Sequence, residues 1–349
     1  MAATSSPRGR SSIRPALLAA LGAGLAVRVA LLVVVVLHQP YLTDVSYYNA
    51  QAVRYLLGGV DPYGAAYSVP SSLATPGAAD VFAYLPGVFA FIAPAGAVGT
   101  PALGMVASDL VVALSLWLLG PRGGLPSLAY FLFPPVILFS TYFVNDSLPA
   151  IAFVALAILA ESRGRPRAAA VLWGLAFGTS VEAWLAFPFY AAYSVRRRRA
   201  LPPLISVLTA AAVVLPFLAW GPAAFVRDTV LFQFQRSPLP LFYSGPFGLS
   251  LNPSLQGVLA SMGEPAPLAL RGALVLAALA LLLWRSDGTL KSLALGTAGF
   301  TAASLFLLPG VAFWSYFELP LMLLAAWYAL RPAGDGGAPP RPPILKEPR

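Results

Sequence analysis

The chain has 349 residues, of which 58% are hydrophobic and only 10% are charged. Because soluble domains carry about 25% charged residues, this composition leaves no room for a separate soluble domain and predicts an all-α polytopic membrane protein. The absence of cysteine excludes disulfides, thiolate chemistry and cysteine-bound zinc, and the net charge of +9 comes from arginines in short loops, a pattern of membrane topology rather than of nucleic-acid binding.

The N-terminal segment, residues 1–14, is basic and is predicted to lie in the cytoplasm. The apolar run at residues 15–38 is too long for a signal-peptide core, and no small-residue cleavage site follows it. We therefore expect an uncleaved first membrane helix. It ends at His38, the single histidine of the chain, for which we expect an interfacial role.

The stretch YLTDVSYYNAQAVRYLLGGVDPYG, residues 41–64, predicts an amphipathic helix in a long first outer loop, followed by an Asp-Pro-Tyr turn. Its Asp44 either caps that helix or accepts a proton as a general base. Tyr47 and its neighbouring tyrosines either anchor the helix at the membrane interface or, with Tyr63 of the turn, position a substrate.

Ten apolar segments, including the first one, have the composition of membrane helices. They are residues 15–38, 101–120, 125–142, 147–161, 168–179, 181–195, 201–220, 267–284, 291–308 and 311–330. The segments 147–161 and 168–179 are short for a full crossing, so they must tilt, extend into flanking residues or be broken. Segment 82–98 either forms a re-entrant or surface-lying hairpin, aided by Pro86 and Pro94, or crosses as an eleventh helix.

The basic residues indicate the topology. With ten crossings, 17 of the 22 lysines and arginines fall on the side of the N-terminus, which the positive-inside rule assigns to the cytoplasm. If segment 82–98 crosses, the loop with Arg122 lies outside instead. The membrane domain is predicted at residues 15–331, and the proline- and glycine-rich tail at 332–349 is predicted to be disordered and cytoplasmic.

Three segments face outward in either arrangement, namely 39–81, 142–147 and 221–266. Asp146, in the turn YFVNDS, either orients an acceptor or caps the following helix. Arg236 is the first candidate for binding a lipid phosphate, because a guanidinium binds phosphate bidentately, and Arg227 is the second. Interfacial snorkelling is the alternative role, and it suits Arg227 and Arg271 better.

Charged residues inside predicted helices cost about 2.5–3.5 kcal/mol each when isolated. Arg28 and Asp109 are therefore predicted to pair and to hold helices together. Glu182 and Glu318 also lie in apolar runs, and Glu318, which stands among aromatic residues in FWSYFELP, is predicted to line a donor-sugar pocket.

Four motifs in this order carry a resemblance to a known family. They are the 41–64 stretch, FAYLPGVFAFIAP, GMVASDLVVAL and, at 249–259, LSLNPSLQGVL. The chain resembles multi-pass, polyprenyl-phosphate-sugar-dependent glycosyltransferases of the GT-C fold. It is similar to glycosyltransferase family 87 and to the first mannosyltransferase of GPI-anchor assembly. The matches and the helix pattern extend over most of the chain, although each motif is short.

The resemblance implies roles for several residues. Asp44 takes the position of the catalytic carboxylate, and the further matches are Asp61-Pro62-Tyr63, Tyr84-Leu85-Pro86, Asp109 and the Asn-x-Ser-Leu-x-Gly element at 252–257. Many relatives have Asp-x-Asp in the first loop, whereas the third position here is Ser46, which weakens any case for a bound divalent metal. Family 87 members often have a lysine near the sixth helix, where this chain has GTSVEAW with Glu182.

The function that follows is an inverting transferase without a cofactor. It would move a hexose, expected to be mannose, from a polyprenyl or dolichol phosphate to a hydroxyl of a lipid or glycan acceptor at the extracytoplasmic face of the cell membrane. The leaving phosphate is already an anion, so no general acid is required, and no pair of carboxylates suited to retaining chemistry is found. The alternatives are a lipid or solute carrier or flippase, disfavoured by the lack of internal repeats, and a non-catalytic lipid-binding scaffold.

Overall fold

The computed structural model describes residues 13–38, 43–70, 81–142, 144–232, 239–245, 248–263, 266–309 and 314–331. These residues form a polytopic helical protein with a single described β-hairpin, which the sequence analysis did not predict. The tail at 332–349 and residues 1–12 of the basic N-terminal segment lie outside the described residues.

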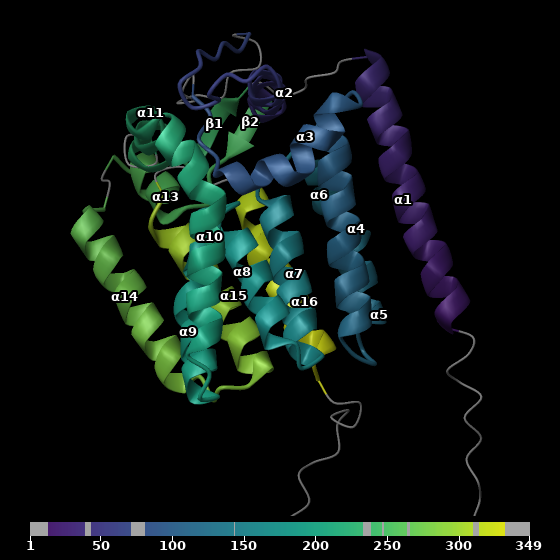
Figure 1. Ribbon diagram of the computed structural model, residues 1–349, viewed down its shortest axis with the longest axis vertical. Coiled ribbons are helices and arrows are strands. Elements are labelled where there is room, and N and C mark those ends of the chain that lie inside the picture. Colours follow the sequence, from purple (N-terminus) through teal and green to yellow (C-terminus); the bar gives the residue numbers. More distant parts are fainter. Residues whose placement is uncertain are drawn as a thin grey trace, which may run out of the picture.

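The first helix lies at one side of the bundle, and the last two long elements of the chain lie in its middle (Figure 1). In chain order they are α1 (Ile13–His38), α2 (Asp44–Leu57), η1 (Pro86–Val88), α3 (Phe89–Ala97), α4 (Ala102–Leu119), α5 (Gly124–Phe131), α6 (Pro134–Thr141), α7 (Leu148–Ser162), α8 (Pro166–Phe177), η2 (Glu182–Ala186), α9 (Phe187–Arg196), α10 (Leu201–Trp220), α11 (Pro222–Val226), η3 (Arg227–Leu231), β1 (Phe242–Gly245), β2 (Gly248–Leu251), α13 (Leu255–Ser261), α14 (Leu268–Arg285), α15 (Leu290–Leu307), η4 (Trp314–Phe317) and α16 (Glu318–Ala329).

Four of the described helices are long and apolar enough to cross a membrane, namely α4, α10, α14 and α15. The predicted span 125–142 consists of two helices, α5 and α6, bent by 58° where Pro134 follows Phe133, because the residue before a proline is displaced from the helical conformation. The two helices count as a fifth candidate if they form one span. Helices α7 and α8 have 15 and 12 residues, the lengths predicted for their spans. The predicted span 181–195 is divided into η2 and the 10-residue α9, and the predicted span 311–330 holds η4 and the 12-residue α16.

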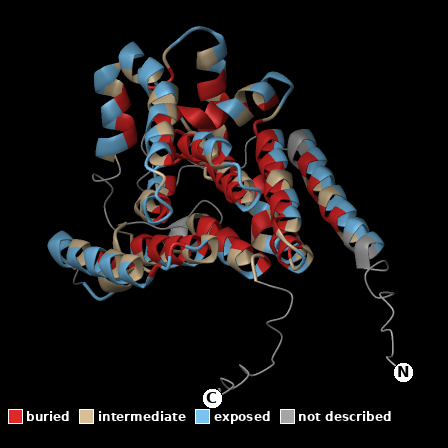
Figure 2. Ribbon diagram, turned by 60° about the horizontal axis from the view of Figure 1, so that its bottom comes forward, coloured by how far each residue is buried: buried red, intermediate tan, exposed pale blue. Residues whose placement is uncertain are grey.

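The helices differ in burial: of the long apolar helices, α10 and α14 lie on the outside, whereas α4 and α15 bury half or more of their residues. Helices α7, α8 and α16 bury most of their side chains around Trp173, Phe177 and Met322. In contrast, α14 exposes most of its large apolar residues, such as Leu276 and Trp284. Figure 2 shows the same distribution, with buried residues in the middle of the bundle and exposed ones on its outer helices. An apolar outer surface of this kind is expected where lipid rather than water surrounds the protein.

Segment 82–98 forms the short elements η1 and α3, and the twelve residues from Pro86 to Ala97 would span only about 18 Å as a helix, less than the hydrocarbon core. Helix α3 lies across the bundle instead of along it (Figure 1). It rests on α4 at Gly104, where a Cβ atom would come within 2.5 Å of the Phe91 carbonyl oxygen. Glycine at this position therefore permits the crossing.

The two ends of the bundle differ in charge. At one end the arginines of several loops bind the last carbonyl groups of neighbouring helices: Arg163 donates to Leu118 O at 2.8 Å and Arg196 to Leu283 O at 3.0 Å. We call it the arginine end. The contact of Arg163 with α4 places the loop of Arg122 at this end, in agreement with the first of the two predicted topologies. The opposite end, which we call the loop end, carries α2, α3, α11 and the β-hairpin (Figure 1).

Candidate active site

The start of helix α2, at the loop end, is part of the candidate site. Thr43 is its N-cap: the Thr43 side chain accepts a hydrogen bond from the Ser46 amide, and Ser46 Oγ accepts one from the Thr43 amide, both at 3.1 Å. This capping box satisfies two amide groups that the first turn leaves open. The cap is therefore Thr43 and not Asp44, and Ser46 completes the capping box.

Asp44 is the first residue of α2 and is only 8% exposed. Its Oδ1 atom accepts a hydrogen bond from the Val45 amide at 2.8 Å. A carboxylate in the first turn is also stabilised by the positive end of the helix dipole. Asp44 is thus buried at the start of α2, with one carboxyl oxygen bound to the backbone.

Asp146 joins α2 to the bundle. Asn49, on α2, donates from Nδ2 to Asp146 Oδ1 at 2.5 Å, and both side chains are buried. Burial raises the pKa of Asp146 well above its ordinary value, hydrogen bonds from Asn49 and Tyr84 lower it, and the negative charges of Glu182 and Asp44 raise it. Asp44 and Glu182 therefore both lie close enough to Asp146 to act on its carboxyl group.

The residues on either side of Asp146 each bind a further carboxylate. Asn145 donates from Nδ2 to Glu318 Oε2 at 3.1 Å, and Ser147 donates from Oγ to Glu182 Oε2 at 2.8 Å. These two glutamates begin α16 and η2, respectively. The three consecutive residues, which we call the 145–147 turn, therefore connect three separate elements at the loop end.

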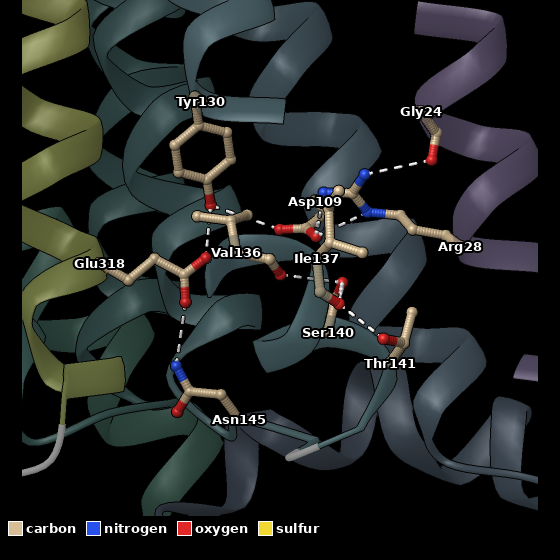
Figure 3. A network of polar contacts seen from close by, with 10 residues as sticks. All are labelled: Gly24, Arg28, Asp109, Tyr130, Val136, Ile137, Ser140, Thr141, Asn145 and Glu318. Atoms are coloured by element: carbon tan, nitrogen blue, oxygen red, sulfur yellow. Dashed lines mark hydrogen bonds and ion pairs between the residues drawn. The ribbon is translucent and has the colours of Figure 1, made fainter. Parts of the chain in front are cut away.

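A buried polar chain leads from this turn into the bundle (Figure 3). Tyr130 donates to Glu318 Oε1 at 2.8 Å and lies 3.3 Å from Asp109 Oδ1. Asp109 in turn forms an ion pair with Arg28, at 3.0 Å from Nη2 and 3.1 Å from Nε, and both charged side chains are fully buried. The chain therefore runs from α1 through α4, α5 and α16 to Asn145.

The tyrosines of the first loop differ in their positions. Tyr63 is fully buried, packs edge-on against Phe225 and Phe82, and donates to the Tyr84 carbonyl oxygen at 2.7 Å. It thus supports the backbone of the Tyr84-Leu85-Pro86 motif from within the aromatic core. Tyr47 is half-buried on α2.

Among the described residues, the arginines that were expected to bind phosphate do not come together in one site. Arg236 lies outside the described residues. The Arg227 side chain is 57% exposed and binds Asp228 Oδ1 at 2.6 Å, so its guanidinium already has a buried carboxylate partner. Arg271 donates to the Leu308 carbonyl oxygen at 2.5 Å and so joins α14 to the end of α15.

The Asn-x-Ser-Leu-x-Gly element begins α13. Ser254 caps the helix by accepting from the Gly257 amide at 3.0 Å, and Asn252 Oδ1 accepts from Ser254 Oγ at 2.9 Å. A Cβ atom at Gly257 would lie 2.5 Å from the Asn252 carbonyl oxygen. The motif therefore forms the start of α13, and Asn252, Ser254 and Gly257 each have a structural role there.

The sequence analysis missed several residues that the structure brings together. Asn49, Tyr130, Asn145 and Ser147 were not singled out, and neither was Asp228. Three of them, Asn49, Asn145 and Ser147, stood in quoted motifs, but nothing in their spacing indicated a partner. Among the described residues, no group of three or more histidine, aspartate or glutamate side chains could hold a metal ion.

Comparison of the chain with protein-family models, with curated proteins and with solved structures gave no match.

Proposed function

We propose that this protein is an inverting, polyprenyl-phosphate-sugar-dependent glycosyltransferase with a GT-C-type bundle of ten or eleven crossings, in which the shorter helices tilt. The observation that carries the proposal is the gathering of Asp44, Asp146 and Glu182 at the end of the bundle opposite the arginine loops. By the positive-inside rule that end is extracytoplasmic. The resemblance of the four ordered motifs supports the same assignment.

Asp44 is the proposed general base. As the acceptor hydroxyl oxygen attacks the anomeric carbon, its proton passes to the Asp44 carboxylate and the bond from the anomeric carbon to the phosphate oxygen breaks. The polyprenyl phosphate leaves with the electron pair of that bond, and the configuration at the anomeric carbon is inverted. A positioned base contributes about 10²–10⁴-fold to such a step.

Glu318 is proposed to position the sugar or the acceptor, together with Tyr47 at the membrane edge, and Asp146 to act on the site through its contact with α2. Tyr63 would act from the core by holding the Tyr84 segment. The donor phosphate is assigned to Arg236 and Arg227, because a guanidinium matches phosphate geometry, and the prenyl chain would lie on the apolar outer helices. The hexose is expected to be mannose, and the acceptor a lipid or a glycan.

A carrier or flippase is the second candidate, and one observation favours it. The buried chain of Arg28, Asp109, Tyr130 and Glu318 places ionisable groups inside the membrane domain, where such groups often form proton pathways. A transferase would use the same chain only to hold its helices together.

The two candidates are separated by supplying membranes that contain the protein with radiolabelled polyprenyl-phosphate mannose and, separately, with a nucleotide sugar. We expect glycosylated product from the lipid-linked donor alone. Movement of sugar or lipid across sealed vesicles without any product would support the carrier and contradict the transferase.

A further inference from the structure

In the 145–147 turn, three consecutive side chains each bind a different element of the loop end. Asn145 binds Glu318 of α16, Asp146 binds Asn49 of α2, and Ser147 binds Glu182 of η2. The partners lie 173, 97 and 35 residues away along the chain, so these contacts are tertiary. A turn that fixes three elements at once determines how they lie relative to one another.

The backbone of the turn is itself constrained. Val144 has φ 52°, a left-handed conformation that is rare and strained for a β-branched residue. The Asn145 amide donates to Phe139 O at 2.9 Å, and the Leu148 amide donates to Asn145 O at 3.1 Å. The fold therefore holds the turn in a conformation that the chain alone disfavours.

The contact of Asp146 with Asn49 acts on the helix that carries Asp44. Asn49 lies five positions after Asp44 on α2, and the capping box at Thr43 fixes the start of the same helix. The hydrogen bonds of Asp146 also include Tyr84, whose carbonyl oxygen is held by Tyr63. Asp146 therefore contacts both α2 and the Tyr84 segment that leads into α3, and so fixes how α2 is rotated relative to that segment.

We infer that the 145–147 turn is the positioning element of the site, and that Asp146 is a positioning residue that sets the orientation of Asp44 through its hydrogen bond with Asn49. The inference rests on the proposed function for its catalytic part, because it names what orients the base. Its structural part, the attachment of α2 to the turn, stands by itself.

The test is a rescue experiment. Asn49→Asp removes the amide donor and places a second acidic side chain against Asp146. We therefore expect kcat for sugar transfer to fall about tenfold or more, with the donor KM changed less than about twofold. The double variant Asn49→Asp/Asp146→Asn restores an amide against a carboxylate, and its kcat should return to within about threefold of wild type.

The matched control is Gln51→Glu, which also adds a carboxylate to α2. Gln51 binds the Ser68 carbonyl oxygen at the exposed surface of the helix, away from Asp146. We expect this variant to keep the wild-type kcat. Asp146→Asn alone retains an acceptor oxygen for Asn49 and should lose less activity than Asn49→Asp.

Amide hydrogen exchange over residues 44–57 gives a readout that does not require activity. Exchange should become about tenfold faster in Asn49→Asp and return toward the wild-type rate in the double variant. If the wild-type protein transfers no sugar, the proposed function fails, but this measurement still decides the role of the turn. An Asn49→Asp protein with wild-type exchange and activity, or a double variant no better than Asn49→Asp, would overturn the inference.

Discussion

Arg28 is held on three sides within the membrane domain. Its guanidinium pairs with Asp109 at 3.0 Å, donates to the Gly24 carbonyl oxygen at 3.3 Å and lies 3.8 Å from the centre of the Phe131 ring. Removing one partner of a buried ion pair leaves the other charge without compensation, which costs more than the pair itself contributes. Loss of Arg28 would therefore cost stability mainly because it leaves the buried Asp109 charge unpaired, and not because the ion pair itself adds much stability.

Replacing Arg28 by Met should therefore destabilise the protein by about 3–5 kcal/mol, because Asp109 remains buried without its cation. The measurement is the thermal or denaturant stability of the detergent-solubilised protein. The double variant Arg28→Met/Asp109→Asn should recover a substantial part of the loss. Arg54→Met, at an exposed position of α2, serves as the control. Equal stability of Arg28→Met and Arg54→Met would contradict the structural role of the pair.

At the scale of elements, close packing depends on glycine at a few crossings. The Gly87 amide donates to the Gly178 carbonyl oxygen at 2.8 Å, which joins η1 to the end of α8. A Cβ atom at Gly87 would meet Thr179 Oγ1 at 2.3 Å, and one at Gly104 would meet the Phe91 carbonyl oxygen at 2.5 Å. Small residues at such contacts let backbones approach one another inside a membrane protein.

Gly104→Ala should therefore destabilise the protein by about 1–3 kcal/mol through overpacking, because the added methyl group meets backbone and not a flexible side chain. Gly22→Ala, in α1, meets nothing within 4 Å and should be neutral or stabilising by up to about 1 kcal/mol. Melting temperatures of the two variants give the comparison. A Gly104→Ala protein as stable as Gly22→Ala would show that α3 does not rest on α4 in this way.

Some elements could be predicted from the sequence and others could not. Helix α2 was expected from its amphipathic pattern, and its ending before Gly58-Gly59 followed from ordinary stop signals. The lengths of α7 and α8 match the predicted spans, whereas α16 is shorter than the predicted span 311–330, because a helix buried among other helices is apolar whether or not it spans the bilayer. The β-hairpin was missed because the segment 221–266 was considered only as an outer loop.

Only part of the candidate site could be predicted from the sequence. An isolated buried charge is costly, so Arg28 and Asp109 could be identified as a pair from composition alone. The contacts of Asn145 with Glu318 and of Asn49 with Asp146 could not, because such pairing depends on tertiary packing over many residues. The role of Asp44 as a base stays a prediction.

At the scale of the whole molecule, the arginine end and the loop end should lie on opposite sides of the membrane. Because the chain has no cysteine, single substitutions give clean labelling sites. Ser68 is exposed in the first loop and Ser162 is exposed at the end of α7. An impermeant maleimide applied to intact cells should label Ser68→Cys at once and Ser162→Cys only after lysis. The reverse order would place the carboxyl cluster in the cytoplasm and contradict the proposed topology.

The central claim is that the Asp44 carboxylate removes the acceptor proton during sugar transfer. The most direct measurement is the single-turnover rate of transfer from polyprenyl-phosphate mannose by equal amounts of folded wild-type and Asp44→Asn protein, with Asp287→Asn at the exposed arginine end as the matched control. We predict a loss of about 10²–10⁴-fold for Asp44→Asn and a wild-type rate for the control. Equal rates for wild-type and Asp44→Asn protein would contradict the account.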